Sequence, residues 1–166
     1  SPDVLLEKGK LALYKNNYQA ALPYFNETIE LDSDNFEAYY YRGLTYLYLS
    51  ELEKAIEDFT ASIKYNPDFP DSYNNRGLAY NYLEKFHEAL SDFTQAIKLD
   101  PQFAEAYMNR GSFYLYTEDF VNARKDFELA AKYNSTNPEL YFLRGRLNYT
   151  EGKYKDAIND FTQAIK

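Results

Sequence analysis

The stretch YNNRGLAYNYLEKFHEALSDFTQAIKLDP, residues 73–101, contains the pattern that decides the fold. Its glycine belongs to a series with a constant step of 34 residues: Gly9, Gly43, Gly77, Gly111 and Gly145. Alanines keep the same step at Ala21, Ala55, Ala89, Ala123 and Ala157, and so do phenylalanines at Phe25, Phe59, Phe93, Phe127 and Phe161. Self-similarity at a fixed period of this length is typical of an array of stacked repeats.

The repeat boundaries follow when each glycine is taken as position eight of its unit. Four whole repeats then span 2–35, 36–69, 70–103 and 104–137, and a partial fifth repeat spans 138–166. No linker or low-complexity segment separates them. We therefore expect a single repeat array over residues 1–166, in which each repeat contacts only its neighbours.

Each repeat is predicted to contain two helices, called A and B. Helix A is expected to cover about fourteen residues, for example 36–49. Its positions four, eight and eleven lie on one face of a helix, which supports this assignment. Helix B begins near Tyr18, Leu52, Phe86, Phe120 and Tyr154. A glycine inside helix A costs about 1 kcal/mol against alanine, so five of them indicate a close approach of helix B. We expect the alanine at position twenty to face this glycine, with the phenylalanine at position 24 beside it.

The pattern Tyr–x₃–Gly–x₂–Tyr, then Ala–x₃–Phe, then Pro, at this period, resembles the tetratricopeptide repeat (TPR) family. The resemblance implies an all-α fold, an α-solenoid of antiparallel helix pairs wound into a right-handed superhelix. It also implies that A helices line a concave groove and B helices form the convex back. TPR arrays bind peptides or protein segments in the groove and are not themselves catalysts. The resemblance therefore predicts a non-enzymatic protein–protein interaction module.

Composition argues against several other functions. The net charge of −8 opposes nucleic-acid binding, which needs clustered Lys and Arg. Cysteine is absent, His87 is the single histidine, and no glycine-rich phosphate loop occurs, so we predict no catalytic residue, metal site or cofactor. No apolar run approaches the length of a membrane span. Composition does not decide the compartment, although the cytoplasm is slightly favoured.

Arginines at position seven match aspartates at position 23. The arginines are Arg42, Arg76, Arg110 and Arg144, and the aspartates are Asp58, Asp92, Asp126 and Asp160. The first repeat departs from both series, with Lys8 and Tyr24. We predict ion pairs between helices A and B; the alternative is a ladder of cations for an anionic ligand.

The groove should be lined by positions two, five, six, nine, twelve and thirteen of helix A. Tyrosines there offer flat contact area, and asparagine amides pair with a peptide backbone of any sequence. The candidate peptide-binding residues are Tyr40, Tyr41, Tyr48, Asn74, Asn75, Asn81, Tyr82, Met108, Asn109, Tyr116 and Arg146. Two alternatives remain open: the asparagines bond within the scaffold, and the tyrosines pack on the next helix A.

The partner is predicted to be a neutral or basic protein segment. Position two is acidic in every repeat: Asp3, Glu37, Asp71, Glu105 and Glu139. TPR co-factors of chaperones grip an acidic C-terminal tail with Lys, Arg and Asn, but the matching positions here read Leu6, Lys10, Tyr41, Asp71 and Asn75. An acid where a cation is needed would repel such a tail.

Two other functions stay open. The last helix B has no following helix to cover Ile158, Phe161 and Ile165, and solenoids need a polar cap. This indicates an assembly scaffold or self-association through the C-terminal repeat. The remaining possibility is a regulatory arm of a larger enzyme.

Overall fold

The chain folds entirely into α-helices. The computed structural model describes residues 1–166 and contains ten helices in successive pairs and no strand. The helices are α1 (Pro2–Tyr14), α2 (Tyr18–Leu31), α3 (Phe36–Tyr48), α4 (Leu52–Tyr65), α5 (Pro70–Tyr82), α6 (Phe86–Leu99), α7 (Ala104–Tyr116), α8 (Phe120–Tyr133), α9 (Pro138–Thr150) and α10 (Tyr154–Ala164). Odd-numbered helices are the A helices and even-numbered ones the B helices, and every B helix begins at the residue that the periodicity predicts. None of them has the length and apolar content needed to cross a membrane.

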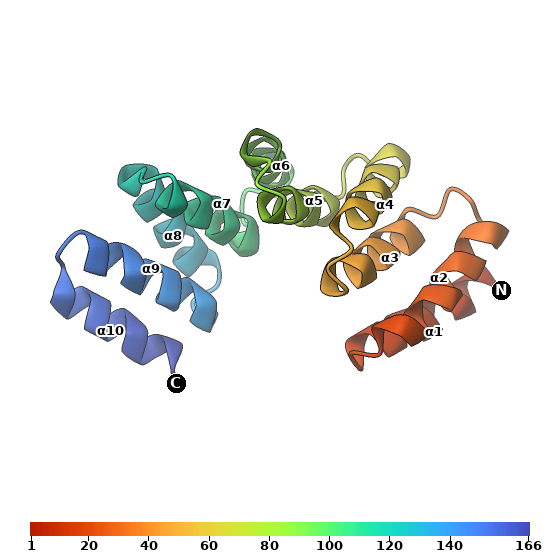
Figure 1. Cartoon of the computed structure of the whole chain (residues 1–166), viewed down its shortest axis with the longest axis horizontal. Helices are drawn as coiled ribbons and strands as arrows, with labels where there is room; N and C mark the ends of the chain where they lie inside the picture. The colour runs from red at the N-terminus through yellow and green to blue at the C-terminus, as the bar shows by residue number, and fades with distance from the viewer. The chain divides into compact units, whose positions relative to one another are not determined.

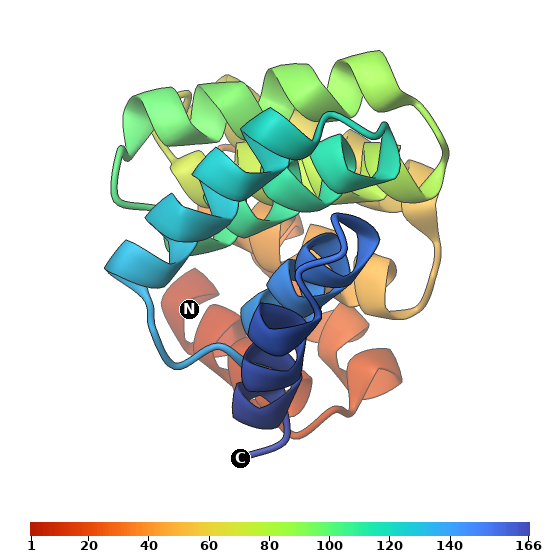
Figure 2. The same cartoon turned by 90° about the vertical axis from the view of Figure 1, so that its left-hand side faces the viewer.

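The helices group into two compact units, residues Ser1–Asp92 and Phe93–Lys166, which divide within α6. In the first unit, α1 packs on α2, α3 packs on both α2 and α4, and α5 packs on α4. In the second unit, α8 packs on α7 and α9, and α9 packs on α10. Figure 1 shows the pairs in chain order, and Figure 2 shows the last pair, α9 and α10, in blue. A single array over residues 1–166 stays a prediction.

The repeated glycines give room to the phenylalanine of the paired helix. A Cβ placed on Gly43 would lie 2.9 Å from Phe59, and one on Gly111 would lie 2.8 Å from Phe127. The phenylalanines at 25, 59 and 127 are fully buried. The atoms nearest Gly9, Gly43, Gly111 and Gly145 therefore belong to the ring at position 24, as predicted, and the crossing of glycine against alanine stays a prediction.

The predicted ion pairs between helices A and B are present in four repeats. Arg42 donates from Nε to Asp58 Oδ2 at 2.7 Å and from Nη2 to Oδ1 at 2.8 Å. The same two-bond geometry joins Arg76 to Asp92, Arg110 to Asp126 and Arg144 to Asp160. Hydrogen bonds to Asp58 raise the pKa of Arg42, against burial that would lower it. The prediction of ion pairs is confirmed.

These arginines also reach back to the preceding repeat. Arg42 Nη1 donates to Asn26 Oδ1 at 2.9 Å, and Arg76 Nη1 donates to Thr60 Oγ1 at 3.0 Å. Each acceptor lies at position 25, on helix B of the repeat before. One guanidinium, with its five donors in a fixed plane, thus holds three helices together.

The turn between helices A and B requires a left-handed residue at position fifteen. Four repeats place a residue with a side chain there, namely Asn16, Ser50, Glu84 and Glu118, with φ between 58° and 60°. The fifth repeat has Gly152, with φ 74°. Gly152, which stands outside the 34-residue glycine series, therefore occupies the one turn position that favours glycine.

Candidate functional site

A series of exposed tyrosines lies at position thirteen of the A helices. In the first unit these are Tyr14, Tyr48 and Tyr82, on the neighbouring helices α1, α3 and α5; in the second unit Tyr116 holds the position on α7. The Tyr48 ring stacks on Tyr18 of the preceding helix B, with centroids 5.2 Å apart. The predicted exposure of the tyrosines at position thirteen is confirmed, and their role in binding stays a prediction.

Four of the predicted groove residues are buried, so the expectation that they face an open groove is wrong. Asn74 has no exposed surface, and Tyr40, Asn75 and Met108 are also buried. Tyr40 packs on Phe59 and on Phe69, with ring centroids 6.0 and 5.0 Å apart. The exposed stripe of these A helices is narrower than six positions, because each packs both on its own helix B and on the neighbouring repeat.

The amide of Asn75 bonds within the scaffold. Its Nδ2 donates to Tyr40 Oη at 3.3 Å and to the carbonyl oxygen of Asp71 at 3.0 Å. Both amide hydrogens are therefore engaged inside the chain. Asn81 and Asn109 are only half-buried, and Arg146 on α9 is exposed. Asn81 and Asn109 therefore expose more of their amide groups to a ligand than the buried Asn74 and Asn75 do.

A polar cluster on α1 and α3 was missed by sequence reasoning. Lys10 Nζ lies 2.8 Å from Glu37 and 2.9 Å from Glu7, and it sits over the Tyr41 ring at 4.8 Å. Burial alone would lower the pKa of Lys10, but the hydrogen bonds to both carboxylates raise it. The signal was a cation at position nine of one repeat followed by an acid at position two of the next.

Tyr41, a predicted groove residue, is half-buried in this cluster. Its ring meets Tyr40 edge-on at 5.0 Å and stacks on Phe25 at 6.2 Å. Burial, together with a hydrogen bond to Tyr14, raises the pKa of Tyr41 to about 12. The phenol is therefore neutral at physiological pH and offers a polar edge beside an ammonium group.

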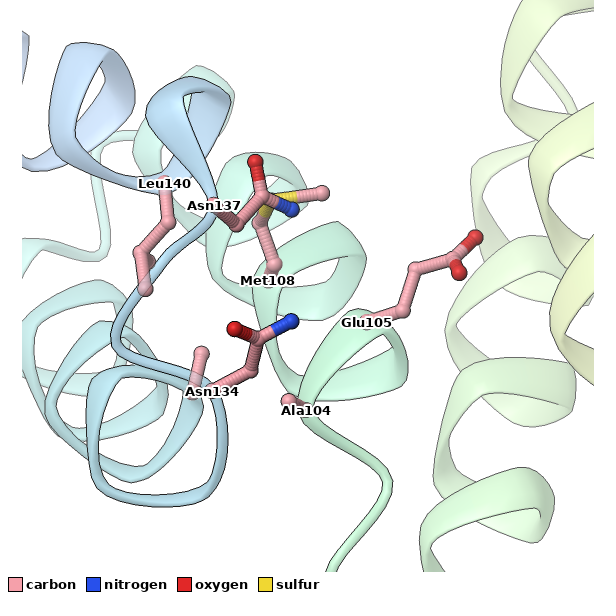
Figure 3. A pocket seen from close by; sticks show the side chains of 7 residues that line it. Ala104, Glu105, Met108, Asn134, Asn137 and Leu140 are labelled. Carbon is pink, nitrogen blue, oxygen red and sulfur yellow. The ribbon is translucent and has the colours of Figure 1, made fainter. Parts of the chain in front are cut away.

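A small pocket lies between the start of α7 and the junction of α8 and α9 (Figure 3). It has a volume of about 70 Å³ and is lined by Ala104, Glu105, Met108, Ala130, Asn134, Asn137 and Leu140. Asn137 Nδ2 donates to Met108 Sδ at 3.4 Å. Asn134 Oδ1 accepts from Thr136, and its amide nitrogen is directed toward the pocket in Figure 3. The pocket suits a small side chain that accepts a hydrogen bond.

The family patterns agree with this architecture. One sequence model of the tetratricopeptide repeat matches residues 70–103, and a second model of the same repeat matches residues 6–68, 42–81 and 114–166. The chain belongs to the tetratricopeptide repeat family, whose members are generally protein–protein interaction modules without enzymatic activity.

Solved structures share the fold at low sequence identity. A thermophilic TPR protein of Thermus thermophilus is 22% identical, with a TM-score of 0.86, 99% of this chain covered and 90% of the other. PilF of Pseudomonas aeruginosa is 20% identical, with a TM-score of 0.88 and coverage of 98% and 76%. YrrB, a TPR protein with an unusual peptide-binding site, is 20% identical, with a TM-score of 0.71 and coverage of 97% and 83%. No curated protein sequence matches the chain significantly.

Proposed function

We propose that this chain is a non-enzymatic module that binds an extended segment of a partner protein across the exposed faces of its A helices. The observation that carries the proposal is the series of exposed tyrosines at one position of neighbouring helices: Tyr14, Tyr48 and Tyr82. Tyrosine gives a large contact area at a low cost in side-chain entropy, and it carries a polar tip. A periodic series of this kind fits side chains spaced along an extended peptide.

Each unit also offers polar groups of its own: a half-buried amide in each, and a small pocket in the second. Asn81 lies directly before Tyr82 on α5, and Asn109 follows Met108 on α7. Partly exposed amides donate to and accept from peptide groups without regard to sequence. The second unit, taken by itself, offers the pocket beside Met108 for a small side chain of a partner and the exposed Arg146 on α9 as one cation.

The charge of the chain favours a neutral or basic segment. The net charge is −8, and the first turns of α1, α3, α5, α7 and α9 each contain an acid. Lys10 of α1, whose ammonium group lies over the Tyr41 ring of α3, is already paired with two glutamates. A basic segment is therefore attracted and an acidic tail is repelled, with both effects weakening as salt rises.

A peptide-array screen with the intact chain, followed by a fluorescence-anisotropy titration of the best binder, tests the proposal. The double variant Tyr48→Ala, Tyr82→Ala should weaken binding tenfold or more, because exposed aromatic anchors carry most of the energy of such contacts, roughly 2 kcal/mol or more each. Val121→Ala, at an exposed site on the B helix α8, is the matched control and should bind as the parent does. Circular dichroism should show the same melting temperature for all three chains.

Two results would overturn the proposal. One is an affinity that the tyrosine variant leaves unchanged while the peptide still binds the chain. The other is a loss of binding in Val121→Ala, which would place the peptide on the B helices.

A further inference from the structure

The pocket in Figure 3 contains two asparagine amides whose orientation is fixed by the chain. Asn134 Oδ1 accepts from the backbone nitrogen of Thr136 at 3.0 Å and from its hydroxyl at 2.8 Å. Asn137 Oδ1 accepts from the backbone nitrogen of Glu139 at 2.9 Å, as the N-cap of α9. Because both oxygens are engaged in these turns, both amide nitrogens are turned toward Met108 (Figure 3). The pocket therefore presents hydrogen-bond donors.

The chain gives these donors only a weak acceptor. The Asn137 amide nitrogen donates to Met108 Sδ at 3.4 Å, and a thioether sulfur is a weak acceptor. The hydrogen bonds of Asn134 use its oxygen, so its amide nitrogen keeps both hydrogens for a ligand. A carbonyl oxygen in the pocket can accept from both amides, because it has two lone pairs.

The first repeat satisfies the same pair of positions within the chain. Positions 31 and 34 are Asp32 and Asn35 there, and Asn35 Nδ2 donates to Asp32 Oδ2 at 2.9 Å. The oxygen of Asn35 is engaged in capping, since it accepts from the backbone nitrogen of Ala38. The fourth repeat has Asn134 in place of the aspartate, and therefore a second donor in place of the acceptor. The oxygen that the first repeat carries in its own chain must come from a ligand in the fourth.

The second repeat fills the corresponding space with a ring. Position 34 is Phe69, which packs edge-on against Tyr40 at position five, with ring centroids 5.0 Å apart. The fourth repeat has the smaller Asn137 and Met108 at these two positions, and a pocket of about 70 Å³ lies beside them, with the buried Leu140 in its wall. This is about the volume of two water molecules in the liquid, enough for a carboxamide group but not for a stretch of main chain.

The charges around the pocket favour a neutral acceptor over a carboxylate. No Lys, Arg or His lines the pocket, and the acidic Glu105 extends from its edge (Figure 3). A carboxylate that entered would lose solvent without gaining a cation, and it would meet a charge of the same sign. A carboxamide accepts the same hydrogen bonds at its carbonyl oxygen and carries no charge.

We propose that this pocket is a specificity site for a primary carboxamide, the side chain of Asn or Gln in a partner protein. The proposal rests on the proposed function in one respect, that the ligand is a segment of a protein. The carbonyl oxygen of the ligand accepts from Asn134 and Asn137, as Asp32 accepts from Asn35 in the first repeat. The site lies wholly within the second unit, so it needs no contact with the tyrosines of the first.

The side-chain amide resonances of the two asparagines measure binding directly. The probes are N-acetyl-asparagine methylamide and its isosteric acid, N-acetyl-aspartate methylamide, each titrated into the isotope-labelled chain at neutral pH. The asparagine probe should shift the resonances of Asn134 and Asn137 along a saturable curve, and the acid should bind about fivefold or more weakly. Asn159, an exposed residue of α10 outside the pocket, should not respond. Unchanged resonances up to the solubility of the probe, or an equal response to the acid, would overturn the proposal.

Two variants identify the pocket as the site. Asn134→Asp supplies Asn137 with an acceptor, as in the first repeat, and Asn137→Phe fills the pocket, as Phe69 does in the second; each should abolish the response to the asparagine probe. Asn159→Asp, which adds the same charge outside the pocket, is the matched control and should respond as the parent does. All three should fold, since phenylalanine already precedes α5 and α7 at position 34, and circular dichroism verifies this. A response that persists in either pocket variant would overturn the proposal.

A peptide that the chain binds tests the role of the pocket in recognition. Substitution of each peptide residue in turn should reveal one position where Asn or Gln binds about fivefold or more tightly than Asp, Glu or Leu. In Asn137→Phe this preference should vanish while the peptide still binds. A peptide with no such position would overturn the assignment of the pocket to peptide recognition. If Tyr48→Ala, Tyr82→Ala fails to weaken binding, the tyrosine site fails, and the response to the free asparagine probe still decides the pocket.

Discussion

Arg124 Nη2 donates to Asn148 Oδ1 at 2.9 Å, across the junction of the fourth and fifth repeats. Arg124 also pairs with Glu151, and Asn148 Nδ2 donates to Asp160 Oδ2 at 2.9 Å. At the junction of the second and third repeats, the same two positions hold Ile56 and Tyr80. A polar surface pocket of about 320 Å³ lies beside Asn148 and is also lined by Arg124 and Asp160. A hydrogen-bonded network has thus replaced an apolar and an aromatic side chain.

Replacing Arg124 with leucine should therefore destabilise the chain, although every sibling repeat has an apolar residue there. The change removes the donor to the buried Asn148 oxygen and should cost about 1–3 kcal/mol. The double change Arg124→Leu, Asn148→Tyr should cost less than the sum of the two single changes, because it restores the side chains of the other repeats. Urea denaturation measures the coupling, and strictly additive free energies would contradict it.

The buried arginine–aspartate pairs should contribute far more than the surface pairs. Arg110→Met leaves the almost fully buried carboxylate of Asp126 without its partner, and this should cost about 3–5 kcal/mol. Lys54→Met, which removes the exposed pair with Glu51, is the matched control and should cost less than about 1 kcal/mol. The free energy of unfolding in urea distinguishes them; similar losses for both would mean that burial does not set the contribution of these pairs.

The features fixed by periodicity could be predicted from sequence. The start of every helix B and the pairing of position seven with position 23 each depend on spacing within one repeat. The sequence shows the first spacing five times and the second four times. The burial of Tyr40, Asn74 and Met108 could not be predicted in this way. It depends on how neighbouring helices cover the sides of helix A, and a helical wheel of one helix does not contain that information.

Single departures from the repeat were also hard to interpret from sequence. Arg124 is a charge at a position that is apolar in the other repeats, and such a departure by itself predicts poor packing. The structure gives it two partners, Asn148 and Glu151, that lie in the next repeat. The compensating change stood at position eleven of the following repeat, so a comparison of positions between adjacent repeats could have found it.

Adding a methyl group at Gly111 should destabilise the fold despite the better helix propensity of alanine. The new Cβ would lie 2.8 Å from the Phe127 ring and 3.2 Å from Asp126 Cβ. Overpacking costs about 1–3 kcal/mol, against a gain of about 1 kcal/mol from propensity. Adding Phe127→Leu to Gly111→Ala should then cost less than it does in the parent. Thermal and urea unfolding measure this, and a more stable Gly111→Ala chain would contradict the close contact.

Glycine at the left-handed turn position should stabilise the chain. Ser50 has φ 60°, and a residue with a side chain in this region costs roughly 1–2 kcal/mol relative to its preferred conformations. Ser50→Gly relieves that cost, loses part of the gain to the greater entropy of the unfolded chain, and should add about 0.5–1 kcal/mol. Ser91→Gly, inside helix α6, is the control and should destabilise by a similar amount. A loss of stability in Ser50→Gly would show that the serine side chain matters more than its backbone conformation.

The raised pKa of Tyr41 makes stability depend on pH in the alkaline range. Burial raises this pKa to about 12 in the folded chain, while an unfolded tyrosine titrates near pH 10. Between these values the folded state holds the proton and the unfolded state has released it, so the stabilising contribution is complete below about pH 10 and is lost as pH rises toward about 12. Tyr41→Phe removes this titration, and its free energy of unfolding should fall less steeply with pH above about pH 10 than that of the parent. Urea denaturation at about pH 8 and about pH 11 measures the two slopes. Parallel slopes would show that the phenol of Tyr41 is accessible to solvent in the folded chain.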